Sequence, residues 1–173
     1  MRLIEAGLLI ICLSGLSRHA LSADATHGAH SDSEDSDFTV MLIGHFDFNT
    51  VQLPNLAFST GTIKGLSTVH ASKITEFSKG DLLTTKCTVG SREEDGKPAL
   101  NALCSNKTKY KDEYAIDCGR LTNIGDDGQG RAEFIGISGK FAEKKGICNY
   151  DAKYTQTNDK VFIRVHFDCK VDS

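Results

Sequence analysis

The chain has 173 residues, with 20 Lys or Arg against 23 Asp or Glu and a formal net charge of −3. This mild negative charge argues against nucleic-acid binding, which favours a basic stripe. The length suits one domain with a hydrophobic core.

The N-terminus has the pattern of a secretory signal peptide. A basic start is followed by an apolar run at residues 6–13, AGLLIICL, which matches a signal-peptide core and is shorter than the ~20 apolar residues of a membrane-spanning helix. Small residues favour cleavage after Ser22, and sites one or three residues later are nearly as good. We therefore expect residues 1–22 to be removed together with Cys12, and the mature protein to be secreted or periplasmic. No second long apolar run follows, so we expect no membrane span.

The next segment, residues 23–37, is expected to be a disordered acidic leader. It reads ADATHGAHSDSEDSD and contains no apolar residue larger than Ala. Such a segment cannot bury enough surface to offset the entropy lost on ordering. We place the start of a single folded domain, residues 38–173, at Phe38.

That domain has the pattern of a β protein. Residues 38–48 and 161–171 alternate between apolar and polar side chains, the period of a half-buried strand. Turn-forming residues such as Pro54-Asn55 separate shorter runs, and no segment shows a helical stripe. These runs lie near residues 56–63, 65–77, 82–89, 99–104, 113–118, 131–136 and 146–154. Many short strands predict an antiparallel barrel or sandwich.

The cysteines after the leader are Cys87, Cys104, Cys118, Cys148 and Cys169. Residues that face each other in a hairpin have a constant sum of residue numbers, so the midpoint of a pair locates the turn. Cys87 and Cys104 centre on Asp95-Gly96, a preferred hairpin turn, and Cys148 and Cys169 centre on Asn158-Asp159. Directly opposed strand positions lie within disulfide range. We predict these two cross-strand disulfides, with Cys104–Cys118 as the competing pairing.

Cys118 is then left without a partner. A leftover thiol in an exported protein indicates a buried inert cysteine or an intermolecular bridge, and a catalytic thiol is a weaker alternative. No cysteines stand at a metal-binding spacing. We expect no metal and no cofactor, and an oligomer is an open alternative.

Other candidate chemistry is sparse. No nucleophile elbow, phosphate loop, dinucleotide fingerprint or zinc-protease motif is present, so no catalytic residue is assigned. His-Phe-Asp occurs twice, at residues 45–47 and 166–168. If the first and last strands are neighbours, these His and Asp side chains could share a metal, although an ordinary polar outer face is the favoured interpretation. Asn106-Lys107-Thr108 is a glycosylation sequon that matters only in a eukaryotic secretory pathway.

One segment, Gly130–Gly146, carries a family resemblance. It reads GRAEFIGISGKFAEKKG and resembles a motif of secreted allene-oxide-cyclase-like barrels, in which a strand ends in a Gly-Gly-Thr-Gly-Lys-Phe turn. The chain departs from that motif at Ile137, and at residues 108–112 it lacks an acidic run usual in the family. The matching positions are Gly136, Gly139, Lys140, Phe141, Ala142 and Gly146. The resemblance implies a closed barrel of about eight strands with a small apolar cavity.

We therefore expect a disulfide-stapled, all-β, closed antiparallel barrel. Such a barrel has room for side chains or one small ligand, so the leading hypothesis is an exported protein that binds a small hydrophobic ligand. The alternatives are a secreted structural or interaction protein and a cofactor-free cyclase or isomerase, because a fold does not fix a function. We expect binding rather than catalysis.

Overall fold

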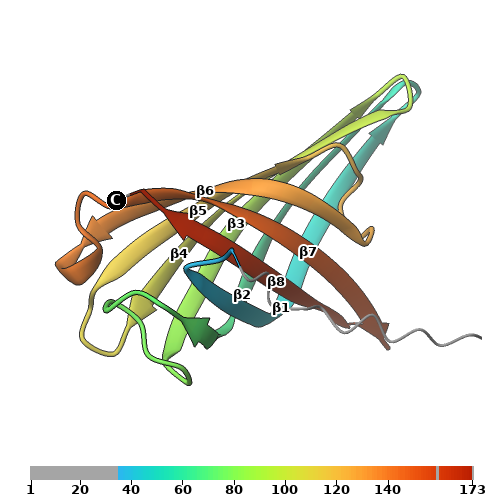
Figure 1. Cartoon of the computed structure of the whole chain (residues 1–173). Coiled ribbons are helices and arrows are strands. Elements are labelled where there is room, and N and C mark those ends of the chain that lie inside the picture. The colour runs from blue at the N-terminus through green and yellow to red at the C-terminus, as the bar shows by residue number, and fades with distance from the viewer. Residues whose placement is uncertain (1–34, 159, 173) are drawn as a thin grey trace, which may run out of the picture. The chain divides into compact units, whose positions relative to one another are not determined.

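In the computed structural model, which describes residues 35–158 and 160–172, eight antiparallel strands close a barrel (Figure 1). Each strand pairs with the next and β8 pairs with β1, so the predicted fold class is confirmed. The elements are β1 Phe38–Leu53, β2 Leu56–Ser72, β3 Leu82–Glu94, β4 Lys97–Thr108, β5 Glu113–Arg120, β6 Gly128–Ser138, the 3-10 turn η1 Gly139–Phe141, β7 Lys145–Thr157 and β8 Lys160–Val171.

The predicted signal peptide and nearly all of the predicted leader lie outside the described residues. Within the described part of the chain, no helix has the length and hydropathy needed to cross a membrane.

Two of the predicted runs, 56–63 and 65–77, largely form the single strand β2. Gly65 does not end a strand as a turn residue would. It lies opposite Gly44 of β1, and a side chain on Gly65 would overlap the backbone oxygen of Ile43. Glycine here lets two strands approach closely, which is one of its recognised uses within a sheet.

Both predicted disulfides are present. Cys87 faces Cys104 across β3 and β4, and Cys148 faces Cys169 across β7 and β8. The turn between β3 and β4 has positive φ at both Asp95 and Gly96, as the tight hairpin turn requires. The competing pairing is wrong, because Cys118 faces Ala102 and keeps a free thiol.

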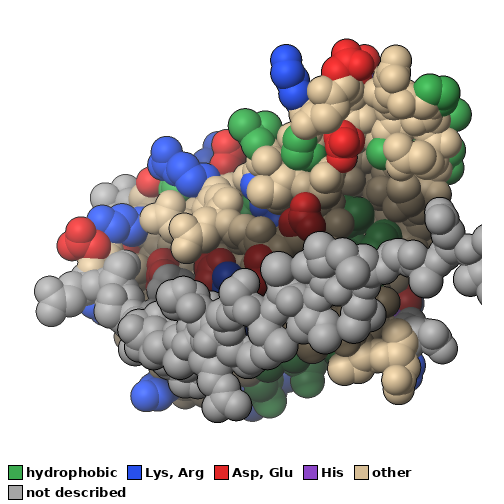
Figure 2. Space-filling view, turned by 90° about the vertical axis from the view of Figure 1, so that its right-hand side faces the viewer, with side chains coloured by type: hydrophobic (Ala, Val, Ile, Leu, Met, Phe, Trp, Pro, Cys, Tyr) green, Lys and Arg blue, Asp and Glu red, His purple; other side chains and the backbone are tan. Residues whose placement is uncertain are grey.

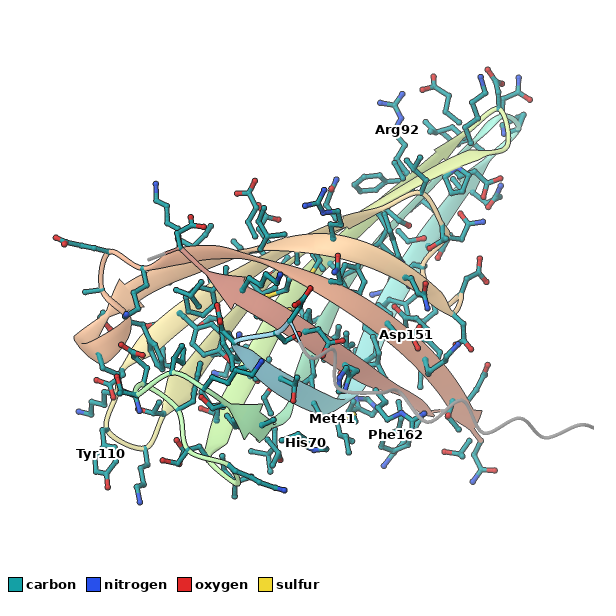
Figure 3. The ribbon with its side chains drawn as sticks, viewed as in Figure 1. Met41, His70, Arg92, Tyr110, Asp151 and Phe162 are labelled. Atoms are coloured by element: carbon teal, nitrogen blue, oxygen red, sulfur yellow. A yellow bond between two sulfur atoms is a disulfide. The ribbon has the colours of Figure 1, made fainter. Side chains whose placement is uncertain are left out.

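One end of the barrel is filled by an aromatic cluster, which we define as Phe38, Phe77, Tyr114, Phe134 and Phe141. All five are buried. Phe77 comes from the β2–β3 loop and Phe141 from η1, and their ring centroids are 4.9 Å apart. Tyr114 packs against Phe134 with a centroid distance of 4.9 Å. These rings plug the interior at the end that carries Tyr110 in Figure 3.

The glycine motif shapes this plugged end. A side chain on Gly136 would overlap the backbone oxygen of Phe141, and Gly139 has a φ of +62° with the Asp112 carboxylate where a side chain would stand. The two glycines therefore let η1 fold tightly against the end of β6, which carries Phe141 into the aromatic cluster.

The opposite end has strands of unequal length. β1 pairs with β8 only from Phe38 to Phe46, and β4 pairs with β5 only from Leu100 onward. Residues 47–62 and 92–99 therefore extend beyond the barrel as a projecting sheet, drawn in cyan and yellow-green in Figure 1 and marked by Arg92 in Figure 3. Val51, Leu53 and Phe58 of this sheet are exposed, and Figure 2 shows hydrophobic side chains on the surface at this end of the molecule.

Tyr114 and Tyr150 form a matched pair for a stability test. The buried Tyr114 hydroxyl has no hydrogen-bond partner among the described residues, whereas the Tyr150 hydroxyl donates to the Gly119 carbonyl oxygen at 3.2 Å. A buried hydroxyl without a partner costs roughly 1–3 kcal/mol. We predict that Tyr114→Phe raises the free energy of unfolding in urea by about 1 kcal/mol and that Tyr150→Phe lowers it by about 1 kcal/mol. A loss of stability in Tyr114→Phe would contradict the assignment.

Candidate functional site: an apolar cavity beside a buried arginine

A small cavity lies inside the barrel, on the side of the disulfides toward the projecting sheet. Its walls are apolar and include Leu42, Ile63, Leu100, Ala152 and Ile163, which come from five different strands. The volume is about 30 Å³. A water molecule needs at least about 10–15 Å³ of such space, so the cavity in this state is no larger than about one or two water molecules.

Among the described residues that line the cavity, Arg120 alone carries a formal charge. It is the last residue of β5, and its inward direction follows from the alternation that also buries Ile116 and Cys118. Only 8% of its surface is exposed. Its Nη2 donates to the Asp126 carbonyl oxygen at 2.7 Å and to the Tyr154 hydroxyl at 3.2 Å. Its Nη1 donates to the Gly128 carbonyl oxygen at 3.3 Å.

The Arg120 guanidinium is buried without an opposite charge. Among the described residues, no carboxylate oxygen lies within ion-pair distance of it, and its Nε–H group has no acceptor. Buried charges are ordinarily paired, because removing an ion from water costs several kcal/mol. Two carbonyl oxygens and a phenol solvate this cation only partly, so the site is electrostatically suited to an anion.

Two tyrosines of β7 complete the site beside Arg120. Burial raises the pKa of Tyr150 to about 12, and burial likewise raises the pKa of Tyr154 although the nearby Arg120 opposes the rise. Both phenols are therefore protonated and neutral at ordinary pH. A general acid or base works best with a pKa near the working pH, so the arrangement is better suited to holding a molecule than to moving a proton.

Cys118 also lines the cavity, and the residue is only 6% exposed. Burial raises its pKa to about 12, with a further contribution from the nearby Asp117 carboxylate. The thiolate is the reactive form of cysteine. The structure therefore matches the first expectation for the unpaired cysteine, a buried thiol.

The repeated His-Phe-Asp segments lie on neighbouring strands, β1 and β8, as expected for a closed barrel. They do not form one site, because His45 faces Phe162 whereas His166 faces Met41 four positions away. Each histidine instead pairs with the aspartate of its own segment, at 3.3 Å for His45 and 3.2 Å for His166. Among the described residues no group of three or more His, Cys, Asp or Glu could hold a metal ion.

Asn106 of the sequon is buried within the barrel, where its Oδ1 accepts a hydrogen bond from Thr85 Oγ1 at 2.7 Å. Thr85 in turn lies 2.6 Å from the Ser67 hydroxyl. A glycan on Asn106 therefore has no room in the folded barrel. Tyr110 is the one strongly exposed tyrosine in the described part of the chain, so the tyrosines form no exposed stacking platform.

Sequence reasoning did not identify Arg120, Tyr150 or Tyr154 as a site. The available signal was the period of two: Arg120 continues the inward positions of Ile116 and Cys118, and the two tyrosines continue the inward position of Cys148. An arginine on the apolar face of a strand is the pattern that could have pointed to this cavity.

Comparison with known proteins finds no family model that matches this chain and no curated protein that is significantly similar to it.

Cys118 generates two linked predictions. With the disulfides intact, iodoacetamide should leave the native protein unmodified and label one thiol after denaturation.

Because the pKa of Cys118 is raised in the folded state, the unfolded chain loses its thiol proton first as pH rises above about 9. The free energy of unfolding should therefore fall between about pH 9 and 12, and Cys118→Ala should reduce that slope by about 1.4 kcal/mol per pH unit. Rapid alkylation of the native protein would contradict both predictions.

Proposed function

We propose that this protein is an exported barrel that binds a small, mainly apolar molecule in the cavity beside Arg120. The observation that carries the proposal is the combination of apolar walls with polar groups confined to one side of the cavity. Pockets for small ligands generally combine apolar walls with a few polar groups that fix orientation. Two disulfides support an oxidising compartment, and the N-terminal pattern supports export to the periplasm or the extracellular space.

The size of the cavity sets a condition on this function. Ligand pockets usually enclose about 300–1,000 Å³, far more than the space present, so binding must open the barrel. Tyr154 is the side chain best placed to move, because it lines the cavity and is only half-buried. Its ring lies 5.9 Å from that of Phe46, which in turn lies 5.0 Å from that of the partly exposed Phe48. Outward movement of Tyr154 and Phe48 would enlarge the cavity toward the projecting sheet.

The family resemblance remains part of this proposal. An eight-stranded barrel and the use of Gly136 and Gly139 to seat Phe141 are compatible with an allene-oxide-cyclase-like protein, and they support kinship without identifying it. Binding is favoured over a cyclase or isomerase activity because the cavity residues with raised pKa values titrate well above neutral pH.

The binding proposal is tested by filling the cavity. Isothermal titration of the exported protein with octanol, decanol, octanoate and decanoate should show saturable binding at a single site. Ala152 lines the cavity and is buried, so Ala152→Val should weaken binding by at least about tenfold through steric exclusion. Ala99→Val, at an exposed position of the projecting sheet, is the matched control and should bind normally.

Absence of binding to all four compounds would contradict the proposed function. Equal binding by Ala152→Val and the unmodified protein would also contradict it, because the compounds would then occupy an outer surface such as the projecting sheet.

A further inference from the structure

Resting on the proposed function, we propose that the bound molecule carries a carboxylate and that Arg120 holds this headgroup while the apolar part occupies the cavity. The proposal deepens the function of the same site by assigning the chemical class of its ligand: a small amphipathic carboxylic acid in its ionised form. Arg120 is then the residue that determines headgroup specificity.

The positive charge of Arg120 favours an anionic ligand. Arg120 is more than nine-tenths buried, and none of the carboxylates in the described ranges pairs with its guanidinium. Removing one partner of a buried ion pair leaves a costly uncompensated charge. In the barrel without ligand, Arg120 is already such an uncompensated charge. An incoming anion would therefore pair with Arg120 without first displacing an acidic side chain.

The hydrogen-bond geometry of Arg120 also favours a carboxylate. Nε is buried without an acceptor, and the longer of the two Nη2 hydrogen bonds goes to the Tyr154 hydroxyl. Nε–H and Nη2–H lie on one edge of the planar guanidinium, and a carboxylate can accept two parallel hydrogen bonds from such an edge. A ligand carboxylate would give Nε an acceptor and replace the Tyr154 hydroxyl on Nη2.

The surroundings of Arg120 keep it positioned for that role. The carbonyl oxygens of Asp126 and Gly128 fix the guanidinium from the β5–β6 loop and the start of β6. The nearby Asp127 carboxylate is engaged elsewhere, since it accepts the backbone N–H of Tyr154 at 2.7 Å and lies 3.5 Å from Lys153 Nζ. Displacement of the Tyr154 hydroxyl couples headgroup binding to the movement that enlarges the cavity.

The test compares octanoate with octanol, which share a chain length and differ in the headgroup. The unmodified protein should bind octanoate at least about tenfold more tightly than octanol, because hydrogen bonds to charged groups are the strong ones. Arg120→Gln should abolish that preference, so that its affinities for octanoate and octanol agree within about twofold. Arg120→Lys, which keeps the charge without the planar fork, should retain only part of the preference.

Tyr154→Phe gives a variant with the opposite sign. It removes the hydroxyl that competes for Nη2, so the preference for octanoate over octanol should rise about threefold. This variant carries the test if Arg120→Gln fails to fold, as judged by circular dichroism. The headgroup assignment would be overturned if the unmodified protein bound the two compounds equally. It would also be overturned if Arg120→Gln and Tyr154→Phe both kept the unmodified protein's preference for octanoate. Either result would leave the binding function standing. Binding of neither compound would overturn both.

Discussion

The pairing of β8 with β1 is the constraint on which the rest of the structure depends. It runs from Phe38 opposite Cys169 to Phe46 opposite Val161, and it converts an open sheet into a barrel without free edges along that length. Asp37 extends the join beyond the first strand, because its N–H donates to the Cys169 carbonyl oxygen and its carboxylate accepts the N–H of Val171. Closure also defines an interior that both disulfides and the apolar faces of all strands share.

The two ends of this interior differ because the strands differ in how far they are paired. At one end, η1 and the β2–β3 loop contribute Phe141 and Phe77, which fill the barrel with aromatic rings. At the other end β1 continues past its last contact with β8 to Leu53, and none of the loop residues that the structure describes there inserts a comparable plug. A narrow apolar space is left there, with Arg120 at the end of the short strand β5 beside it.

Under the proposed function, this arrangement makes the site a compromise between folding and binding. An apolar residue at position 120 would pack against the cavity without the desolvation cost of a charge. Position 120 instead carries a guanidinium, and its hydrogen-bond partners in the described part of the chain are neutral oxygens. Retaining a partly satisfied cation in an otherwise apolar lumen is understandable if the cation contributes to binding.

Local periodicity predicted much of the fold. Alternation gave the first and last strands, and the midpoints of two cysteine pairs gave both disulfides because hairpin register is a local property. Gly65 could not be interpreted in that way, since its role depends on the backbone of a different strand. The continuation of β1 past residue 48 into the projecting sheet was likewise not predicted, because the polar and apolar residues there no longer face a core.

The candidate site was harder to predict for the same reason. The position of Arg120 on an inward face is readable from β5, but its lack of an acidic partner depends on which loops and strands surround it. Tyr154 reaches Arg120 only because β7 and β5 both line the same closed lumen. Long-range closure therefore creates the site, and no short motif encodes it.

The most direct test of this account is nuclear magnetic resonance of the Arg120 side chain during titration with octanoate. The Nε–H signal of Arg120, assigned by its absence in Arg120→Lys, reports the one guanidinium donor that is buried without an acceptor. The account predicts that this signal shifts and exchanges more slowly with water as octanoate saturates the protein, while octanol leaves it nearly unchanged. Saturation with octanoate without any change at the Arg120 Nε–H signal would contradict the central claim.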